Sequence, residues 1–471
     1  VRYACVVNEL KHVNGRTGMG AVMGSKNLRA IAVRGTQRVP LANPEKVQEI
    51  GKKALELLSQ SGMAQNLKKF GTPMFVMPLQ NSGILPTRNF QKGQFEGAEA
   101  ICGEKMTDTI LVKSEGCYAC AVQCKRSVKV DGKYKASPEY GGPEYETIAS
   151  LGSYCGIDNL AAIAQGNEMC NRYGLDTISV GVCIAFAMEL VEKGILTAKD
   201  TDGIDLRFGN TDDMLAMIGK IARREGFGDV LAEGVQRAAR KIGKGAEKFA
   251  MQVKGAEMSA GDPRGMPVRA VSYATSTRGS DHLRSNPYVE ELITPEEGRQ
   301  YFGSPEAADI FQGLQGKGRL LAWSENFVTI GDLLGLCKFA YYRSATFSYL
   351  RKKGVELATR FYNACNGTEL SDEDMLRAGE RAFNVEKAFN AREGAGRDRD
   401  IIPERFFTEE LTGGGPSQGA VVDRGKFDRI LNEYYACRGW NEETGLQKRE
   451  TLENLGLKEI ADDLAQRGRL G

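Results

Sequence analysis

Histidine is nearly absent from this sequence: the chain of 471 residues holds only His12 and His282. A zinc site built on histidine needs several imidazole ligands, so this scarcity argues strongly against that class of metal centre. A dominant charge of one sign is also lacking, because 63 basic and 61 acidic residues leave a net charge of +2. Without a dense Lys/Arg block to follow a phosphate backbone, no nucleic acid partner is expected.

Long apolar runs are missing as well. A membrane-spanning helix needs about 18 or more apolar residues, whereas the best candidate, Ile178–Leu190, is shorter and carries Glu189. We interpret it as a buried helix and expect no membrane association and a cytoplasmic location. The sequence has no signal peptide, but it begins with Val1 in what reads as the middle of a domain. We therefore expect that an N-terminal part is missing.

Cysteine, by contrast, is plentiful, with 11 residues. An odd number in a long chain without a secretion signal argues against a disulfide framework and leaves metal binding open. Cys117, Cys120 and Cys124 follow one another at offsets of three and four, so their thiolates can point at one small volume. This spacing suits an iron–sulfur cubane whose fourth ligand comes from elsewhere.

A zinc site would equally need a distant cysteine, because the sequence has no second C-x-x-C motif. Our candidate for the fourth ligand is Cys337. Taken alone, it would be interpreted as a buried small hydrophobe, which is the usual state of a free cysteine.

Hydrophobic patterning predicts a mostly helical chain with a β-rich beginning. The apolar runs Tyr3–Val7 and Ala30–Val33 are typical of strands, on either side of the glycine-rich loop Gly15–Gly24. Helical periodicity begins after Asn43, which caps a helix with proline at its first position. Helices are predicted over Pro44–Leu58, Asn159–Arg172, Ser179–Glu192, Asp212–Arg224 and Phe227–Ile242, and from the capping pair Ser371 and Asp374 to near Gly394.

The stretch Lys254–Gly265, rich in glycine, proline and small residues, indicates a domain boundary. We therefore divide the chain into residues 1–42, 43–253 and 254–471. The first part is β-rich, the second is helical and carries the three-cysteine motif, and the third is helical and carries Cys337 and His282. The predicted fold class is mainly α with a β-rich N-terminal remnant, an α+β multidomain architecture.

Several further motifs stand out, in the segments Arg16–Lys26, Gly116–Cys124, Pro143–Glu146, Asn171–Asp176, Asp262–Gly265, Tyr273–Arg284 and Asp332–Cys337. Together they resemble the aldehyde:ferredoxin oxidoreductase family, and the resemblance spans essentially the whole chain. This family holds tungsten, sometimes molybdenum, between two pterin dithiolenes beside a [4Fe–4S] cluster. The resemblance makes residues 1–42 the tail of an N-terminal β-sandwich-type pterin-binding domain.

The activity that the resemblance implies is oxidation of an aldehyde to a carboxylic acid, with water supplying the oxygen. Electrons would pass through the cluster to ferredoxin, or, as in some relatives, to a ferredoxin-like iron–sulfur subunit paired with a flavin subunit. The family has two Asp-x-x-Gly-Leu-(Asp/Cys) motifs, one for each pterin, because a carboxylate can accept two adjacent N–H groups.

In this sequence the second of these motifs is intact, with Asp332 and Leu336 at the pterin and Cys337 at the cluster. In the first motif Leu175 and Asp176 fit, but Asn171 stands where aspartate is expected. An amide carries no charge, so this pterin is expected to be held more weakly.

The glycine-rich loop would, by the same resemblance, offer backbone N–H groups and an arginine to the cofactor phosphates. The residues concerned are Arg16, Thr17, Gly18 and Met19. A dinucleotide fingerprint is the competing interpretation, but it needs a helix after the glycines, and the end of the segment 27–35 reads as a strand. Arg278 and Arg284 match family positions that contact pterin or phosphate, although spacing alone favours solvated surface arginines.

His282 and Glu146 match the family positions beside the metal, which implies proton transfer to or from the substrate oxygen. The plain alternatives are a satisfied core histidine and an exposed glutamate, and the neighbouring Glu144 is a rival for the carboxylate role. Two other functions stay open. One is the family branch that reduces aromatic-ring thioesters, which the surroundings of His282 disfavour. The other is a non-catalytic iron–sulfur electron-transfer subunit, which the pterin motifs disfavour.

Overall fold

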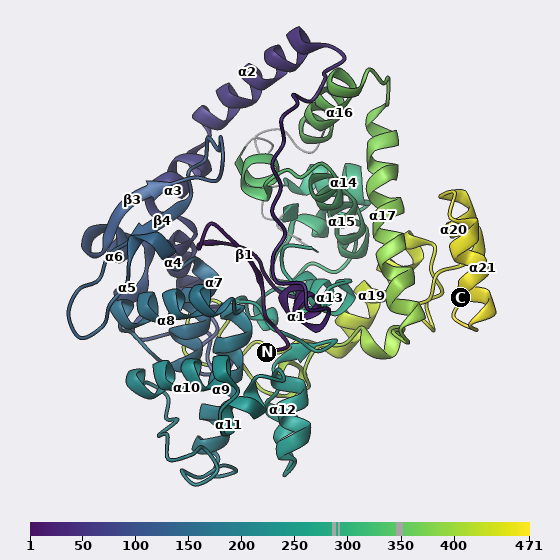
Figure 1. Ribbon diagram of the computed structural model, residues 1–471. Coiled ribbons are helices and arrows are strands. Elements are labelled where there is room, and N and C mark those ends of the chain that lie inside the picture. Colours follow the sequence, from purple (N-terminus) through teal and green to yellow (C-terminus); the bar gives the residue numbers. More distant parts are fainter. Residues whose placement is uncertain (285–288, 291–292, 345–351) are drawn as a thin grey trace.

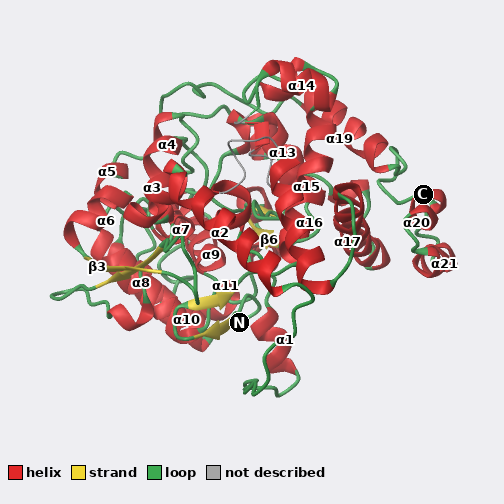
Figure 2. Cartoon of the chain, turned by 90° about the horizontal axis from the view of Figure 1, so that it is seen from above, coloured by secondary structure: helices red, strands yellow, loops and turns green. Residues whose placement is uncertain are grey.

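Helices dominate the computed structural model of the chain, which describes residues 1–284, 289–290, 293–344 and 352–471 (Figure 1). The described strands form three antiparallel pairs and appear as short arrows among the helices (Figure 2). These pairs are β1 (Val6–Asn8) with β2 (His12–Asn14), β3 (Leu111–Glu115) with β4 (Lys125–Val128), and β5 (Gln252–Val253) with β6 (Ala256–Glu257). The predicted mainly helical class is confirmed.

The helices of the first half are α1 (Met19–Ser25), α2 (Pro44–Gln60), α3 (Gly62–Phe70), α4 (Val76–Asn81), α5 (Ala98–Ile101), α6 (Gly103–Thr109), α7 (Tyr145–Leu151), α8 (Leu160–Tyr173), α9 (Thr177–Glu192), α10 (Thr211–Arg223), α11 (Phe227–Leu231) and α12 (Val235–Ile242). Those of the second half are α13 (Pro267–Thr275), α14 (Pro295–Phe302), α15 (Lys317–Leu333), α16 (Lys352–Asn366), α17 (Asp372–Arg392), α18 (Arg405–Thr408), α19 (Arg424–Arg438), α20 (Arg449–Asn454) and α21 (Lys458–Gln466).

Local capping explains why most of the predicted helices are confirmed. The Asn43 side chain accepts a hydrogen bond from the N–H of Lys46 at the start of α2, and Ser371 with Asp374 forms a complete capping box at the start of α17. The predicted helices that correspond to α8, α9 and α10 are confirmed as well.

One predicted helix and one predicted strand are wrong. The predicted helix Phe227–Ile242 is two helices, because the chain turns at Gly234 with a φ of 86° between α11 and α12. The predicted strand Ala30–Val33 is an extended segment without regular structure, in which Ile31 is 71% and Val33 89% exposed. β-prone residues form a strand only when a neighbouring strand supplies hydrogen bonds, and none of the described strands pairs with this segment.

The centre of the core is α9, whose residues Ile178–Leu190 are all buried, as the sequence predicted for this run. The main hydrophobic cluster around it draws residues from Tyr3 to Trp440, so it joins segments from all three predicted domains. The boundaries at 42 and 253 stay predictions. Among the described residues, none of the helices combines the length and the apolar character needed to cross a bilayer.

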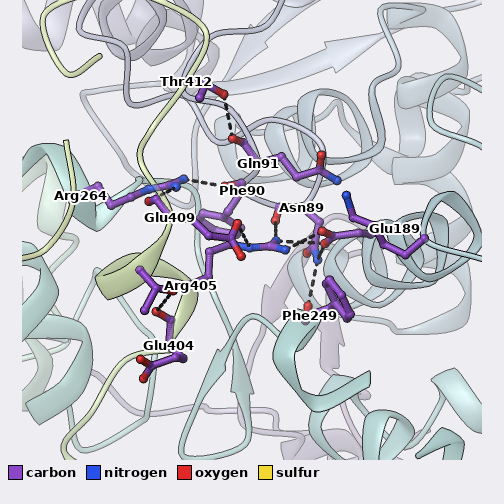
Figure 3. Close-up of polar contacts among 12 residues, drawn as sticks. Asn89, Phe90, Gln91, Glu189, Phe249, Arg264, Glu404, Arg405, Glu409 and Thr412 are labelled. Atoms are coloured by element: carbon purple, nitrogen blue, oxygen red, sulfur yellow. Dashed lines mark hydrogen bonds and ion pairs between the residues drawn. The ribbon is translucent and has the colours of Figure 1, made fainter. Parts of the chain in front are cut away.

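A buried polar network fastens the C-terminal part of the chain to this core (Figure 3). Arg405 forms a bidentate ion pair with Glu189 of α9 and donates a hydrogen bond of 2.7 Å to the carbonyl of Asn89. Arg264, paired with Asp262 at 2.6 Å, donates to the carbonyl of Phe90. Residues 88–90 all have left-handed backbone angles, with φ between 48° and 65°. The two buried arginines therefore hold a turn that is costly for non-glycine residues.

Candidate functional site

A cavity of about 1320 Å³ brings together most of the residues that the sequence singled out. Its walls include the thiols of Cys117, Cys124 and Cys337 and the side chains of Glu146 and His282. The predicted cofactor residues that also line it are Arg16, Thr17, Met19, Asn171, Leu175, Asp176 and Arg278. Small-ligand sites usually measure about 300–1000 Å³, so this cavity has room for a large cofactor together with a substrate.

The four predicted cluster cysteines come together in space. Burial raises the pKa of the Cys124 thiol to about 12, and Glu144 and then the Cys337 and Cys120 thiols act in the same direction. Burial likewise raises the pKa of Cys117, opposed by Lys125 and reinforced by Cys120 and Cys337. Such mutual effects require that the thiols lie near one another.

A cluster site differs in geometry from a site for one ion. Within the described residues, no group of three or more His, Cys, Asp or Glu side chains is arranged to hold a single metal ion. In a cubane each thiolate binds an iron of its own, so four ligands surround a volume rather than meet at a point. Cys117 and Cys337 are exposed, while Cys120 and Cys124 are partly buried.

Arg126 fixes the cysteine loop to the rest of the fold. Its buried guanidinium donates to the carbonyls of Lys68 and Lys69 at the end of α3 and to that of Gln123 in the loop. Sequence reasoning gave no role to this arginine, nor to His12, whose Nδ1 lies 3.8 Å from Sγ of Cys117. Both contacts join segments far apart in the sequence, and no local pattern marks them.

The structure separates the two rival carboxylates. Glu144 pairs with Lys125 at 2.8 Å and accepts a hydrogen bond of 2.5 Å from the hydroxyl of Thr72. Glu146 instead accepts a hydrogen bond of 2.9 Å from the N–H of Ala260 and places Oε1 3.4 Å from Nδ1 of His282. Of the two, Glu146 is the carboxylate that faces the histidine.

His282 is only 18% exposed. Burial lowers the pKa of its imidazole below the usual 6.5, and the Glu146 carboxylate opposes that shift. The histidine is therefore neutral at neutral pH and able to accept a proton.

The predicted phosphate arginine has protein partners. Nε of Arg16 lies 3.6 Å from Oδ2 of Asp176, and its guanidinium donates to the carbonyls of Ser280 and Glu257. The amide of Asn171 donates to the carbonyl of Tyr140 at 2.9 Å, while Leu175 is buried and its segment bridges to Ala4.

The glycines of the same loop serve close backbone packing. Arg16, Thr17 and Gly18 all have left-handed φ values, and α1 follows them directly. A Cβ atom on Gly18 would lie 2.1 Å from the carbonyl oxygen of Arg2, and one on Gly20 would lie 2.3 Å from that of Cys5.

The helix α1 corrects the expectation that no helix follows the glycines. This helix does not support a dinucleotide-binding fold, because α1 buries none of its side chains and the described strand pairs are all antiparallel.

Three of the predicted cofactor residues, Arg278, Arg284 and Asp332, form ion pairs. Arg278 pairs with Asp281 at 2.6 Å. Arg284 is buried rather than a solvated surface group, and it pairs with Asp332 at 2.5 Å and with Glu386. Asp332 also contacts Lys338, and Leu336 beside it is exposed.

The site fits the implied cofactors in the kind of groups it offers. Nε of Arg278, which lines the cavity, is buried and has no hydrogen-bond partner in the part of the chain that the structure describes. Buried polar atoms normally have partners, and a polar pterin in the cavity would supply one. The thiols likewise offer the soft donors that an iron–sulfur cluster requires.

Comparisons with known proteins identify the family of this chain. The family model "Aldehyde ferredoxin oxidoreductase, domains 2 & 3" matches residues 49–457, and the model of that family's N-terminal domain matches residues 1–35. The tungsten-containing aldehyde ferredoxin oxidoreductase of Pyrococcus horikoshii is 39% identical over 98% of this chain and 72% of its own length. That of Thermococcus kodakarensis is 38% identical with the same coverage.

More distant similarities extend the comparison. The aliphatic sulfonate oxidoreductase, WOR-like subunit, of Pyrococcus furiosus is 29% identical over 98% of this chain and 68% of its own length. The active-site complex BamBC of benzoyl coenzyme A reductase with 1,5-dienoyl-CoA has a TM-score of 0.79 and 24% identity, covering all of this chain and 73% of that one. It shares the fold. With its motifs, its fold and both family models in agreement, the chain belongs to the aldehyde ferredoxin oxidoreductase family.

Proposed function

We propose that this protein oxidises aldehydes to carboxylic acids at a tungsten bis-pterin centre and passes the electrons through a [4Fe–4S] cluster. The observation that carries the proposal is a single cavity lined both by cluster-type thiols and by the His282–Glu146 pair. The names of the relatives favour tungsten, and molybdenum is the alternative metal.

The cofactors have identifiable protein groups. Cys117, Cys120, Cys124 and Cys337 would hold the cluster, and the carboxylate of Asp332 would receive the N–H groups of one pterin. When bound, the metal centre supplies the two-electron chemistry that converts the aldehyde and water into the acid. Asp332 lies between two cations in the structure, Arg284 and Lys338, which would share it with the pterin.

His282 would act as the base. Oxidation of an aldehyde with water releases two electrons and two protons, so the site needs an acceptor for protons. Because Glu146 faces Nδ1, it favours the tautomer that carries a proton there, which leaves Nε2 free to accept one from the substrate. Glu146 is itself held by the N–H of Ala260, so it also fixes the orientation of the ring.

The apolar part of the cavity would bind the hydrocarbon part of the aldehyde and keep out excess water. Phe75, Leu79, Met266 and Ile310 line it there. Because the thiols of Cys117 and Cys337 are exposed, a cluster bound there would be within reach of an external acceptor, for which ferredoxin or a ferredoxin-like subunit is proposed.

Metal analysis combined with an activity assay tests the proposal. The protein is produced without oxygen in medium that contains tungstate or molybdate, and its iron, tungsten and molybdenum are measured. Reduction of a viologen dye is then followed with and without an aldehyde. Iron plus tungsten or molybdenum with aldehyde-dependent reduction supports the proposal. Iron alone would favour an electron-transfer subunit, and ring-thioester reduction without aldehyde oxidation would favour the reductase branch.

The fourth cluster ligand is testable by itself. Cys337→Ser should lose most of the cluster iron and the cluster's visible absorbance, because serine replaces a soft thiolate by a hard hydroxyl. Cys437→Ser is the matched control, since Cys437 is also exposed and free. A variant Cys337→Ser that retains the iron content and spectrum of the wild-type protein would remove Cys337 from the ligand set.

A further inference from the structure

A buried glutamate that the proposed reaction does not use lies next to a residue that it does use. Glu257, in β6, is only 4% exposed. Its Oε1 accepts a hydrogen bond of 2.8 Å from the N–H of Val235, at the start of α12, just after the break at Gly234. Its Oε2 lies 2.7 Å from the hydroxyl of Ser179, in the first turn of α9.

The hydroxyl of Ser179 has a second carboxylate neighbour, because Oδ2 of Asp176 also lies 2.7 Å from it. A serine hydroxyl has one proton to donate. If it donates to one carboxylate, the other short contact needs a proton of its own. The three side chains are therefore arranged to share one extra proton between Glu257 and Asp176.

The surroundings decide which carboxyl carries that proton. Asp176 accepts the N–H of Ile178 at 3.0 Å and faces the guanidinium of Arg16, so its charge is well compensated. Burial raises the pKa of Glu257. The other titratable groups that face Glu257 are Arg16, Tyr3 and Cys183.

Tyr3 and Cys183 are uncharged, because burial raises the pKa of both well above the usual range. Arg16 directs Nη2 at the backbone carbonyl of Glu257. A cation, Arg16, lies beside the Asp176 carboxylate, whereas the Glu257 carboxyl contacts the N–H of Val235 and the hydroxyl of Ser179, so these contacts favour Glu257 as the carrier of the shared proton.

The two carboxyls belong to different cavities. Asp176 lines the cavity of the proposed active site, whereas Ser179 and Glu257 line a second cavity of about 1150 Å³. The walls of the second cavity include charged side chains such as Arg2, Glu233 and Lys254.

We infer that Asp176, Ser179 and Glu257 form a proton relay that leads from the active-site cavity to the second cavity. This inference rests on the proposed function, since aldehyde oxidation releases the protons to be moved. In one cycle Glu257 gives its proton to water in the second cavity. Asp176 then takes a proton from the active-site cavity and passes it to Oγ of Ser179, while the hydroxyl proton moves to Glu257. The relay moves one proton, and no electron changes place.

The variant Glu257→Gln separates a relay from a structural role. The glutamine amide keeps the shape of the glutamate side chain. It can accept a hydrogen bond from the N–H of Val235 and donate one to the hydroxyl of Ser179, but it can neither release nor take up a proton. Glu393→Gln is the matched control, because Glu393 lines the same cavity and is 60% exposed. Ser179→Ala should break the relay, and Ser179→Thr, which keeps a hydroxyl, should restore it.

The infrared absorption spectrum and the steady-state kinetics, kcat and KM, are measured for each variant at neutral pH. The wild-type protein and Glu393→Gln should show the C=O band of a protonated carboxylic acid, and Glu257→Gln should lack it. Glu257→Gln and Ser179→Ala should lower kcat roughly 10-fold or more with KM unchanged, and raise the solvent deuterium isotope effect.

The infrared test needs no substrate, so it reports on the shared proton even if the protein oxidises no aldehyde. The inference is overturned if the acid band persists in Glu257→Gln, or if kcat in both Glu257→Gln and Ser179→Ala stays within roughly twofold of wild type.

Discussion

At the scale of single residues, His282 should set the lower pH limit of activity. Burial lowers the pKa of its imidazole below 6.5, and the neutral form is the base. The value of kcat/KM should therefore rise with pH below about 6.5 and be level at neutral pH. Glu146→Gln removes the charge that opposes this shift, so the rise should move to lower pH. His282→Asn should abolish it. A rise centred above pH 6.5, or one unchanged by His282→Asn, would assign the limit to another group.

How much of the site the sequence could predict depends on whether a residue belongs to a local motif. Cys117, Cys120 and Cys124 lie in one turn, and their spacing alone indicates metal binding. His282 and Glu146 were predicted because they match motif positions. Ser179 and Glu257 were missed, because a serine near a helix start and a glutamate in a short strand have no chemical signature until the fold places their oxygens 2.7 Å apart.

At the scale of elements, the glycines of α1 should differ in what they tolerate. Gly20→Ala should loosen the N-terminal segment, since the new Cβ would lie 2.3 Å from the carbonyl oxygen of Cys5. Gly24→Ala, in the same helix with nothing within 4 Å, should be neutral or stabilise by up to about 1 kcal/mol.

Hydrogen exchange of the Cys5 and Gly20 amides, which donate to Gly174 and Ala4, measures the difference between these two variants. Gly20→Ala should speed exchange roughly 10-fold, as expected for an overpacking cost of about 1–3 kcal/mol. Equal exchange in the two variants would show that this contact relaxes freely.

Secondary structure was predictable where a local interaction defines an element's end and unpredictable where a distant partner does. Asn43 and Ser371 mark helix starts with their own side chains. The break at Gly234, by contrast, depends on Glu257, whose carboxylate would lie 2.8 Å from a Cβ atom at that glycine. Residues 30–33 have the composition of a strand, but composition cannot say whether a partner strand is present.

At the scale of the whole molecule, the ion pair between Arg405 and Glu189 should contribute to global stability. Arg405→Met leaves a buried carboxylate without its partner, which should cost about 3–5 kcal/mol in the free energy of unfolding. Arg424→Met, which breaks a solvent-exposed pair with Glu404, should cost no more than about 1 kcal/mol. Denaturant unfolding compares the two.

The double variant Arg405→Met/Glu189→Gln should lose less stability than Arg405→Met alone, because the unpaired charge is gone. Equal losses from Arg405→Met and Arg424→Met would mean that the buried pair is not what joins these segments. No motif in the sequence predicted this link, which joins residues more than 200 positions apart.

The open position of the cysteine loop has a practical consequence. Cys117 and Cys337 are exposed, and Tyr118, which follows Cys117 in the cysteine motif, is fully in solvent. Dissolved dioxygen could therefore reach the sulfur and iron of a cluster bound at this edge directly. If the protein holds the proposed cluster, preparations handled in air should lose its visible absorbance, while the buried histidine and its carboxylate stay intact.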